Sequence, residues 1–144
     1  KEKRMINTQH FVGLSEKFWE DINWFESLSR STQTFPPYDL LRVDEDNAVL
    51  EFALAGYDKE TIDITVKPTE TNVRILEVCG GASDDENAEE SYEHRGIARR
   101  KFTARIPLSQ YWEVSDAKMS NGILSVNLHR NVPEEKKPVT ISIK

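Results

Sequence analysis

The chain has 144 residues, which is enough for one domain with flanking arms. It is 38% hydrophobic and 31% charged with a net charge of −6, the composition of a soluble, acidic, globular protein. This charge disfavours nucleic acid as a partner, because nucleic-acid binding relies on Lys and Arg neutralising phosphates. A membrane span is also excluded, since no apolar run approaches the roughly 20 residues needed to cross a bilayer.

Residues 1–36 are predicted to form an N-terminal arm that is partly helical. Apolar residues recur there at gaps of three and four, which places them on one face of an amphipathic helix. The helix could pack on the domain's own core, or it could form an exposed, sticky arm. We favour the exposed arm, because no second helix follows to form a partner layer and unpaired apolar surface marks an interaction site. The candidate contact residues are Phe11, Leu14, Phe18, Trp19, Ile22, Trp24 and Phe25.

Residues 37–130 are predicted to form an all-β domain. Leu50, Phe52 and Leu54 alternate with other residues, as do the apolar residues of the stretches 62–66 and 102–108, so each stretch buries one face of a strand. The stretch 73–78 is apolar on both faces, which is typical of a central strand. Many short strands with turn signals between them indicate an immunoglobulin-like β-sandwich.

The stretch 82–95 interrupts the strand pattern with six acidic residues in ten positions. A solvated surface loop is the ordinary explanation for such a run. A calcium loop is the alternative, but the stretch lacks the bend glycine and the ligand spacing of such loops. A basic cluster follows, for which we prefer pairing with the acidic loop across a dimer to nucleic-acid binding. Its members are Arg99, Arg100, Lys101 and Arg105.

Asn121-Gly122 predicts a two-residue hairpin, because both residues tolerate the positive φ of a type I′ turn. The surrounding pattern A-x-x-x-N-G-x-L, filled by Ala117, Asn121, Gly122 and Leu124, resembles the signature of the alpha-crystallin domain of small heat shock proteins. Four further stretches resemble this family, three of them its bacterial members and 53–57 its general strand-then-glycine pattern, and the chain as a whole is most similar to the inclusion-body-binding class. They are residues 11–18, 36–38, 53–57 and 94–100.

The resemblance implies that the long loop carries a short strand that adds to the sheet of a neighbouring subunit. We expect Ser91, Tyr92, Glu93 and His94 to form this strand and to pair near residues 40–43 of the partner. The family usually has an arginine two residues after the phenylalanine that matches Phe102. Here Ala104 stands at that place, so the dimer-interface role of that arginine is not assigned to a residue of this chain.

Residues 131–144 are predicted to form an extended C-terminal tail, because they are charged and contain two prolines. Ile141-Ser142-Ile143 matches the I-x-I anchor of the family. The alternative is a last strand in the sheet of the same subunit. The anchor is expected to bind an apolar groove lined by Ile62, Ile64, Val66, Ala117 and Met119.

No catalytic site is predicted. The three histidines lack metal-ligand spacing, and Cys79 in an apolar strand is interpreted as a small core residue. The lone cysteine fits a reducing compartment, and without a signal-peptide pattern we expect a cytoplasmic location. No phosphate-binding loop appears, so neither a cofactor nor an ATP site is expected.

The resemblance therefore implies an ATP-independent holdase. Such a chaperone binds unfolding client proteins, assembles from dimers into larger homo-oligomers, and keeps its clients soluble for ATP-driven chaperones. The alternative is a co-chaperone or scaffold module of the CS-domain type, which shares the sandwich but binds one folded partner. Modules of that type lack the I-x-I tail and the long loop, so both features argue against this alternative.

Overall fold

Seven strands lie in the residues described by the computed structural model, which are 23–28, 35–71, 73–81, 91–97 and 99–144. The chain divides into two units, Lys1–Ser31 and Thr32–Lys144. The described part of the first unit is a helical segment, residues 23–28, in which the rings of Trp24 and Phe25 lie 4.7 Å apart. All the strands belong to the second unit.

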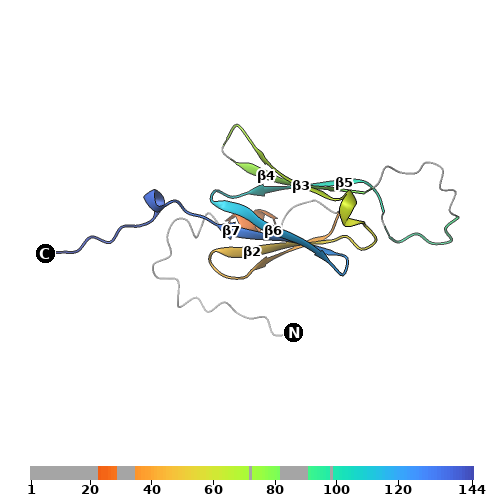
Figure 1. Ribbon diagram of the computed structural model, residues 1–144, viewed down its shortest axis with the longest axis horizontal. Helices are drawn as coiled ribbons and strands as arrows, with labels where there is room; N and C mark the ends of the chain where they lie inside the picture. The colour runs from red at the N-terminus through yellow and green to blue at the C-terminus, as the bar shows by residue number, and fades with distance from the viewer. Residues whose placement is uncertain (1–22, 29–34, 72, 82–90, 98) are drawn as a thin grey trace. The chain divides into compact units, whose positions relative to one another are not determined.

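The strands form two antiparallel sheets that stack as layers (Figure 1). The four-stranded sheet has the order β1-β2-β7-β6 and the three-stranded sheet the order β3-β4-β5. This arrangement confirms the predicted β-sandwich. The bounds are β1 (Tyr38–Arg42), β2 (Asn47–Ala53), β3 (Asp63–Pro68), β4 (Arg74–Gly80), β5 (Phe102–Leu108), β6 (Trp112–Ser120) and β7 (Ile123–Arg130), with the 3₁₀ turns η2 (Lys59–Thr61) and η3 (Glu134–Lys136).

The core lies between the two sheets and follows from the period-two alternation of the strands. On β5 every second residue is buried, beginning at Phe102, while Thr103 and Arg105 between them are exposed. Leu50, Phe52 and Leu54 are fully buried, as their alternation predicts. Burying a side chain of this size contributes about 1.5–3 kcal/mol, so this alternation decides which face of each strand turns inward.

The hairpin between β6 and β7 has the predicted turn. Asn121 and Gly122 have φ values of 53° and 75°, as a type I′ turn requires. A Cβ on Gly122 would lie only 3.0 Å from the Cα of Ala55. The carbonyl of Gly122 also accepts a 2.8 Å hydrogen bond from the N–H of Leu54, so the turn is fixed against the end of β2.

One interpretation is wrong, and one alternative is ruled out. Cys79 is not a core residue: it is half-buried and shares the outer face of β4 with Glu77, because residues two apart on a strand lie on one face. The tail does not form a last strand, since residues 137–144 belong to neither sheet.

Candidate functional site

β1 forms one open edge of the four-stranded sheet. One side of β1 pairs with β2 over the whole length of the strand, and no described strand pairs with its other side. Two large apolar side chains are exposed here, Leu41 by 45% and Val43, just beyond the strand, by 64%. An open edge with exposed apolar side chains is a template for an added strand.

The segment 91–97, between β4 and β5, contains the four residues predicted to add to a neighbouring sheet. It is exposed throughout and has no regular secondary structure within this chain. Figure 1 shows it projecting beyond one end of the sandwich, while the C-terminal tail leaves at the other end. The guanidinium of Arg95 lies 4.9 Å from the centre of the Tyr92 ring, which is itself 48% exposed.

The residues predicted to line the anchor groove lie on two further edge strands, β3 and β6, except Ile62, which comes just before β3. Ile64 and Val66 of β3 are opposite core residues of β4, and Ala117 and Met119 of β6 are opposite core residues of β7. Their side chains therefore face the space between the sheets. Ile62, Ile64 and Met119 are half-buried and Val66 and Ala117 are exposed, because no described strand pairs with the outer side of β3 or β6.

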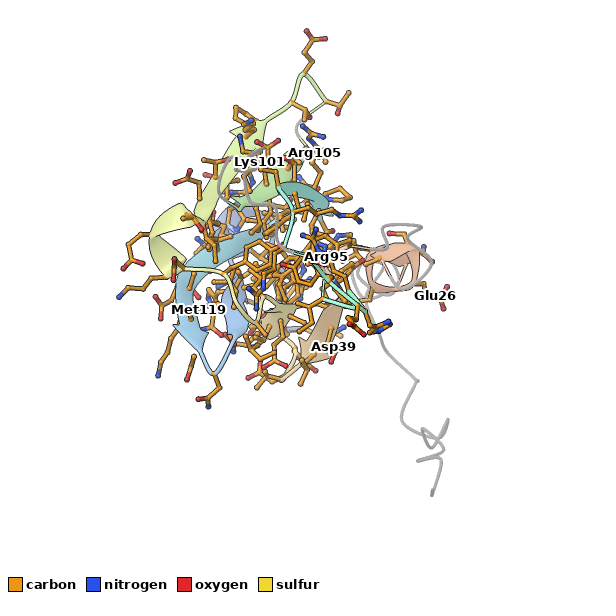
Figure 2. All side chains as sticks on the ribbon, turned by 90° about the vertical axis from the view of Figure 1, so that its right-hand side faces the viewer. Glu26, Asp39, Arg95, Lys101, Arg105 and Met119 are labelled. Carbon is orange, nitrogen blue, oxygen red and sulfur yellow. The ribbon has the colours of Figure 1, made fainter. Side chains whose placement is uncertain are left out.

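β3 and β6 lie along the same side of the sandwich. Phe35, just before β1, packs edge-on against Phe102 of β5 at 6.0 Å, so the β1 and β5 edges share one side. The order of the strands then leaves β6 and β3 together on the opposite side. Figure 2 agrees with this, since Met119 of β6 and Asp39 of β1 lie at opposite edges of the four-stranded sheet. The structure thus brings the predicted groove residues into one apolar strip.

The tail presents its apolar residues to solvent. After η3, residues 137–144 have no regular structure. Val139, Ile141 and Ile143 are 83%, 85% and 99% exposed. The two isoleucines are therefore open to contact, and their anchor role stays a prediction.

An aromatic cluster closes the base of the long loop. The Tyr57 hydroxyl donates a 2.8 Å hydrogen bond to the carbonyl of Arg100, and the Tyr57 ring packs edge-on against Phe102 at 5.4 Å. The guanidinium of Arg100 lies 4.7 Å from the centre of the Phe35 ring. Gly81, with φ of 97°, allows the chain to pass close to Arg100, since a Cβ there would lie 2.9 Å from the Arg100 carbonyl oxygen.

Glu77 is a buried charge that the sequence analysis missed. It is only 8% exposed, in the middle of β4 on the outer face of the three-stranded sheet. Its carboxylate accepts hydrogen bonds from Lys67 Nζ at 2.6 Å and Arg105 Nε at 3.0 Å. The hydrogen bond from Lys67 lowers the pKa of Glu77 below its ordinary value, with a further contribution from Arg105. The sequence did contain a sign of this buried charge, because Glu77 stands between the apolar residues Leu76 and Val78.

Two members of the basic cluster have partners within their own chain. Arg105 is paired with Glu77, and Arg100 with the Phe35 ring, within one chain. Pairing of the cluster with the acidic loop of a partner stays a prediction. Most of the acidic residues of that loop lie outside the described residues.

Most of the candidate client-binding residues also lie outside the described residues, namely Phe11, Leu14, Phe18, Trp19 and Ile22. Of the two that the structure describes, Trp24 is 8% exposed and Phe25 is half-buried. Client binding by this arm stays a prediction.

Neither a metal site nor a membrane helix is found in the described part of the chain. No group of three or more His, Cys, Asp or Glu side chains there could hold a metal ion. None of the helices in the same residues is long and apolar enough to cross a bilayer.

Comparison with known proteins settles the family. The model of the Hsp20/alpha crystallin family matches residues 41–144. The chain belongs to this family. Its relatives include the small heat shock protein IbpA of Serratia proteamaculans, which is 35% identical over 116 residues, or 81% of this chain and 80% of the relative. IbpA of Yersinia pestis is 34% identical over the same shares.

Solved structures of small heat shock proteins show the same fold. The protein of Synechococcus phage S-ShM2 is 28% identical with a TM-score of 0.51, and the match covers 76% of this chain and 99% of that one. A truncated form of AgsA from Salmonella typhimurium is 26% identical with a TM-score of 0.53, covering 66% and 98%. These findings confirm the family resemblance.

Membership fixes the general activity of this small heat shock protein. It is a chaperone that prevents the aggregation of other proteins and forms oligomers, and it is not an enzyme.

Proposed function

We propose that this small heat shock protein works as an ATP-independent holdase in the cytoplasm, with a separate part of the chain for each task. The N-terminal arm contacts unfolding clients, the segment 91–94 joins two chains into a dimer, and Ile141 and Ile143 join dimers into larger oligomers. ATP-driven chaperones then act on the clients that it holds. Binding an unfolded form prevents its aggregation but does not refold it.

The observation that carries this proposal is the match between exposed segments and open edges. Among the described strands β1 has a partner on one side only, and the segment 91–94 is exposed and belongs to neither sheet. β3 and β6 offer a partly exposed apolar strip, and the two isoleucines of the tail are exposed. Adding a strand to an edge supplies main-chain hydrogen bonds, while alternate side chains fill the apolar sites.

Oligomers built in this way are held by individually weak contacts. Each isoleucine gains about 1.5–3 kcal/mol when fully buried, and ordering the tail offsets much of this gain. Many tails acting together still bind well, because each bound tail raises the effective concentration of the next. We therefore expect a large oligomer that exchanges its dimers and releases them on warming.

An aggregation assay without nucleotide tests the proposal. The full chain should keep a heat-unfolding client in solution, while light scattering shows a particle much larger than a dimer. Changing both Ile141 and Ile143 to Ala should reduce the particle to dimers with the sandwich still folded. Ser142→Ala, on the other face of the tail, is the matched control. A requirement for ATP, or an unchanged particle mass in the double variant, would contradict the proposal.

A further inference from the structure

The tail carries a third apolar residue in phase with the two isoleucines. Val139, Ile141 and Ile143 stand at every second position, with Thr140 and Ser142 between them. In an extended chain, residues two apart lie on one face, so all three apolar side chains point the same way. Val139 is as open to solvent as Ile141, with exposed fractions of 83% and 85%.

The apolar strip at the β3 and β6 edges also has three positions. On one side they are Ile62, which is extended just before β3, and Ile64 and Val66 of β3. On β6, Met119 and Ala117 face inward, and a β-bulge between Val114 and Asp116 adds one residue to the strand. Because of this extra residue, Val114 faces inward as well, opposite the core residue Leu128. A regular strand would have turned Val114 to the outer face.

The two sets of residues match in length. Val139 to Ile143 and Ile62 to Val66 each span four residue steps, which is about 13 Å in an extended strand. With Ile141 opposite Ile64, the remaining residues fall opposite one another in either strand direction. Val139 then lies at one end of the strip, beside Ile62 or Val66.

We propose that the tail of a second copy binds this strip through three side chains, with Val139 as the third anchor. The inference rests on the anchor role proposed above for the two isoleucines and extends it by one position. The chain just before Val139 is suited to this contact. Lys137 is extended, with φ of −80° and ψ of 146°, and Pro138 keeps the residue before it in that region. The segment thus reaches the strip already extended, which lowers the ordering cost.

The first test measures how oligomers of the full chain dissociate on dilution, using light scattering. Val139→Ala should raise the chain concentration at half-dissociation by about tenfold, the change expected when most of a buried valine side chain is removed. Two matched controls should leave it unchanged: Thr140→Ala on the other face of the tail, and Val73→Ala, which removes an exposed valine elsewhere. If Val139→Ala behaves like the controls, the third anchor is wrong. The proposed function would still stand if the isoleucine double variant dissociates.

The second test locates Val139 by disulfide crosslinking, with Cys79→Ser as the background. Chains with Val139→Cys are mixed with chains carrying Ile62→Cys or Val66→Cys, and oxidation should give a crosslinked pair of chains in one of the two mixtures. Thr65→Cys, on the opposite face of β3, is the control partner and should crosslink far less. A chain that carries both cysteines is oxidised in parallel. If crosslinks form only within that single chain, and not between the mixed chains, the occupant of the strip is the chain's own tail. Either that result or equal crosslinking to Thr65→Cys overturns the proposal.

Discussion

Changing Gly122 to Ala should lower the free energy of unfolding of the sandwich by about 2 kcal/mol or more. Gly122 has φ of 75°, a conformation that costs an L-residue with a Cβ roughly 1–2 kcal/mol. The added Cβ would also lie 3.0 Å from the Cα and 3.1 Å from the Cβ of Ala55. Ala55 cannot easily give way, because the neighbouring N–H of Leu54 is bonded to the Gly122 carbonyl at 2.8 Å. Strain and crowding therefore add.

Urea unfolding followed by circular dichroism measures this difference. The chain concentration must be the same for all variants, because oligomer assembly links stability to concentration. Asn121→Gly is the matched control at the neighbouring turn position, where φ is 53°. Glycine relieves the strain of that φ but raises the entropy of the unfolded chain, so the control should stay within about 0.5 kcal/mol of the parent.

The two variants together test the turn itself. If Gly122→Ala is as stable as the parent, the hairpin can absorb the Cβ by changing its turn type, and the argument from the positive φ fails. If both variants are strongly destabilised, the side chain of Asn121 contributes more than its tolerance of positive φ. Only a large loss for Gly122→Ala beside a small change for Asn121→Gly supports the reasoning.

Four further predictions concern the arm, the loop and the buried charge. Deleting residues 1–34 should leave a folded sandwich that suppresses client aggregation poorly, so equal protection by the deleted form would argue against client binding by the arm. Deleting residues 88–94 should give monomers in sedimentation experiments at low concentration, and a normal dimer would contradict the strand exchange. Tyr57→Phe should lose about 1 kcal/mol of stability in urea unfolding with its hydrogen bond to the Arg100 carbonyl, and no loss would show that this bond is replaced by water. The pKa of Glu77 is lowered in the folded state, so its charge stabilises the fold above pH 4.5, and this stabilisation is lost as the pH falls through the folded pKa. Glu77→Gln should therefore lower the free energy of unfolding relative to the parent at pH 7, and lower it less at pH 3. An equal difference at both pH values would contradict the ion-pair argument.

The sequence predicts the sandwich well because its strands are buried on one face only. Strict alternation, as in Leu50, Phe52 and Leu54, has few competing explanations, and Asn121-Gly122 restricts the turn type. The strand that was misjudged in part is β4, where Glu77 and Cys79 lie on the outer face of a central strand. The burial of Glu77 depends on Lys67 of β3 and Arg105 of β5, which lie on neighbouring strands, so it cannot be predicted from the local pattern.

The β-bulge in β6 is a second feature that the sequence pattern does not predict. Reading β6 with a strict period of two from Ala117 places Ser115 inward and Val114 outward. The register shift reverses this, and Val114 pairs with Leu128 on the inner side. A bulge depends on how two strands pair over their full length, because one strand must hold two residues opposite one residue of the other. Local alternation therefore locates the apolar strip but misses its third position.

The arrangement of polar and apolar residues explains why assembly should use edges rather than faces. The outward-facing residues of β6 include Glu113, Asp116 and Lys118, all exposed, and those of β5 include Arg105. Packing such faces together would remove charges from water, at a cost that the burial of a few apolar groups does not offset. An edge strand instead offers backbone groups that a second strand can satisfy, beside half-buried apolar side chains. Contacts of this kind are narrow and individually weak, so a chaperone built on them can dissociate and expose new surface without unfolding its sandwich.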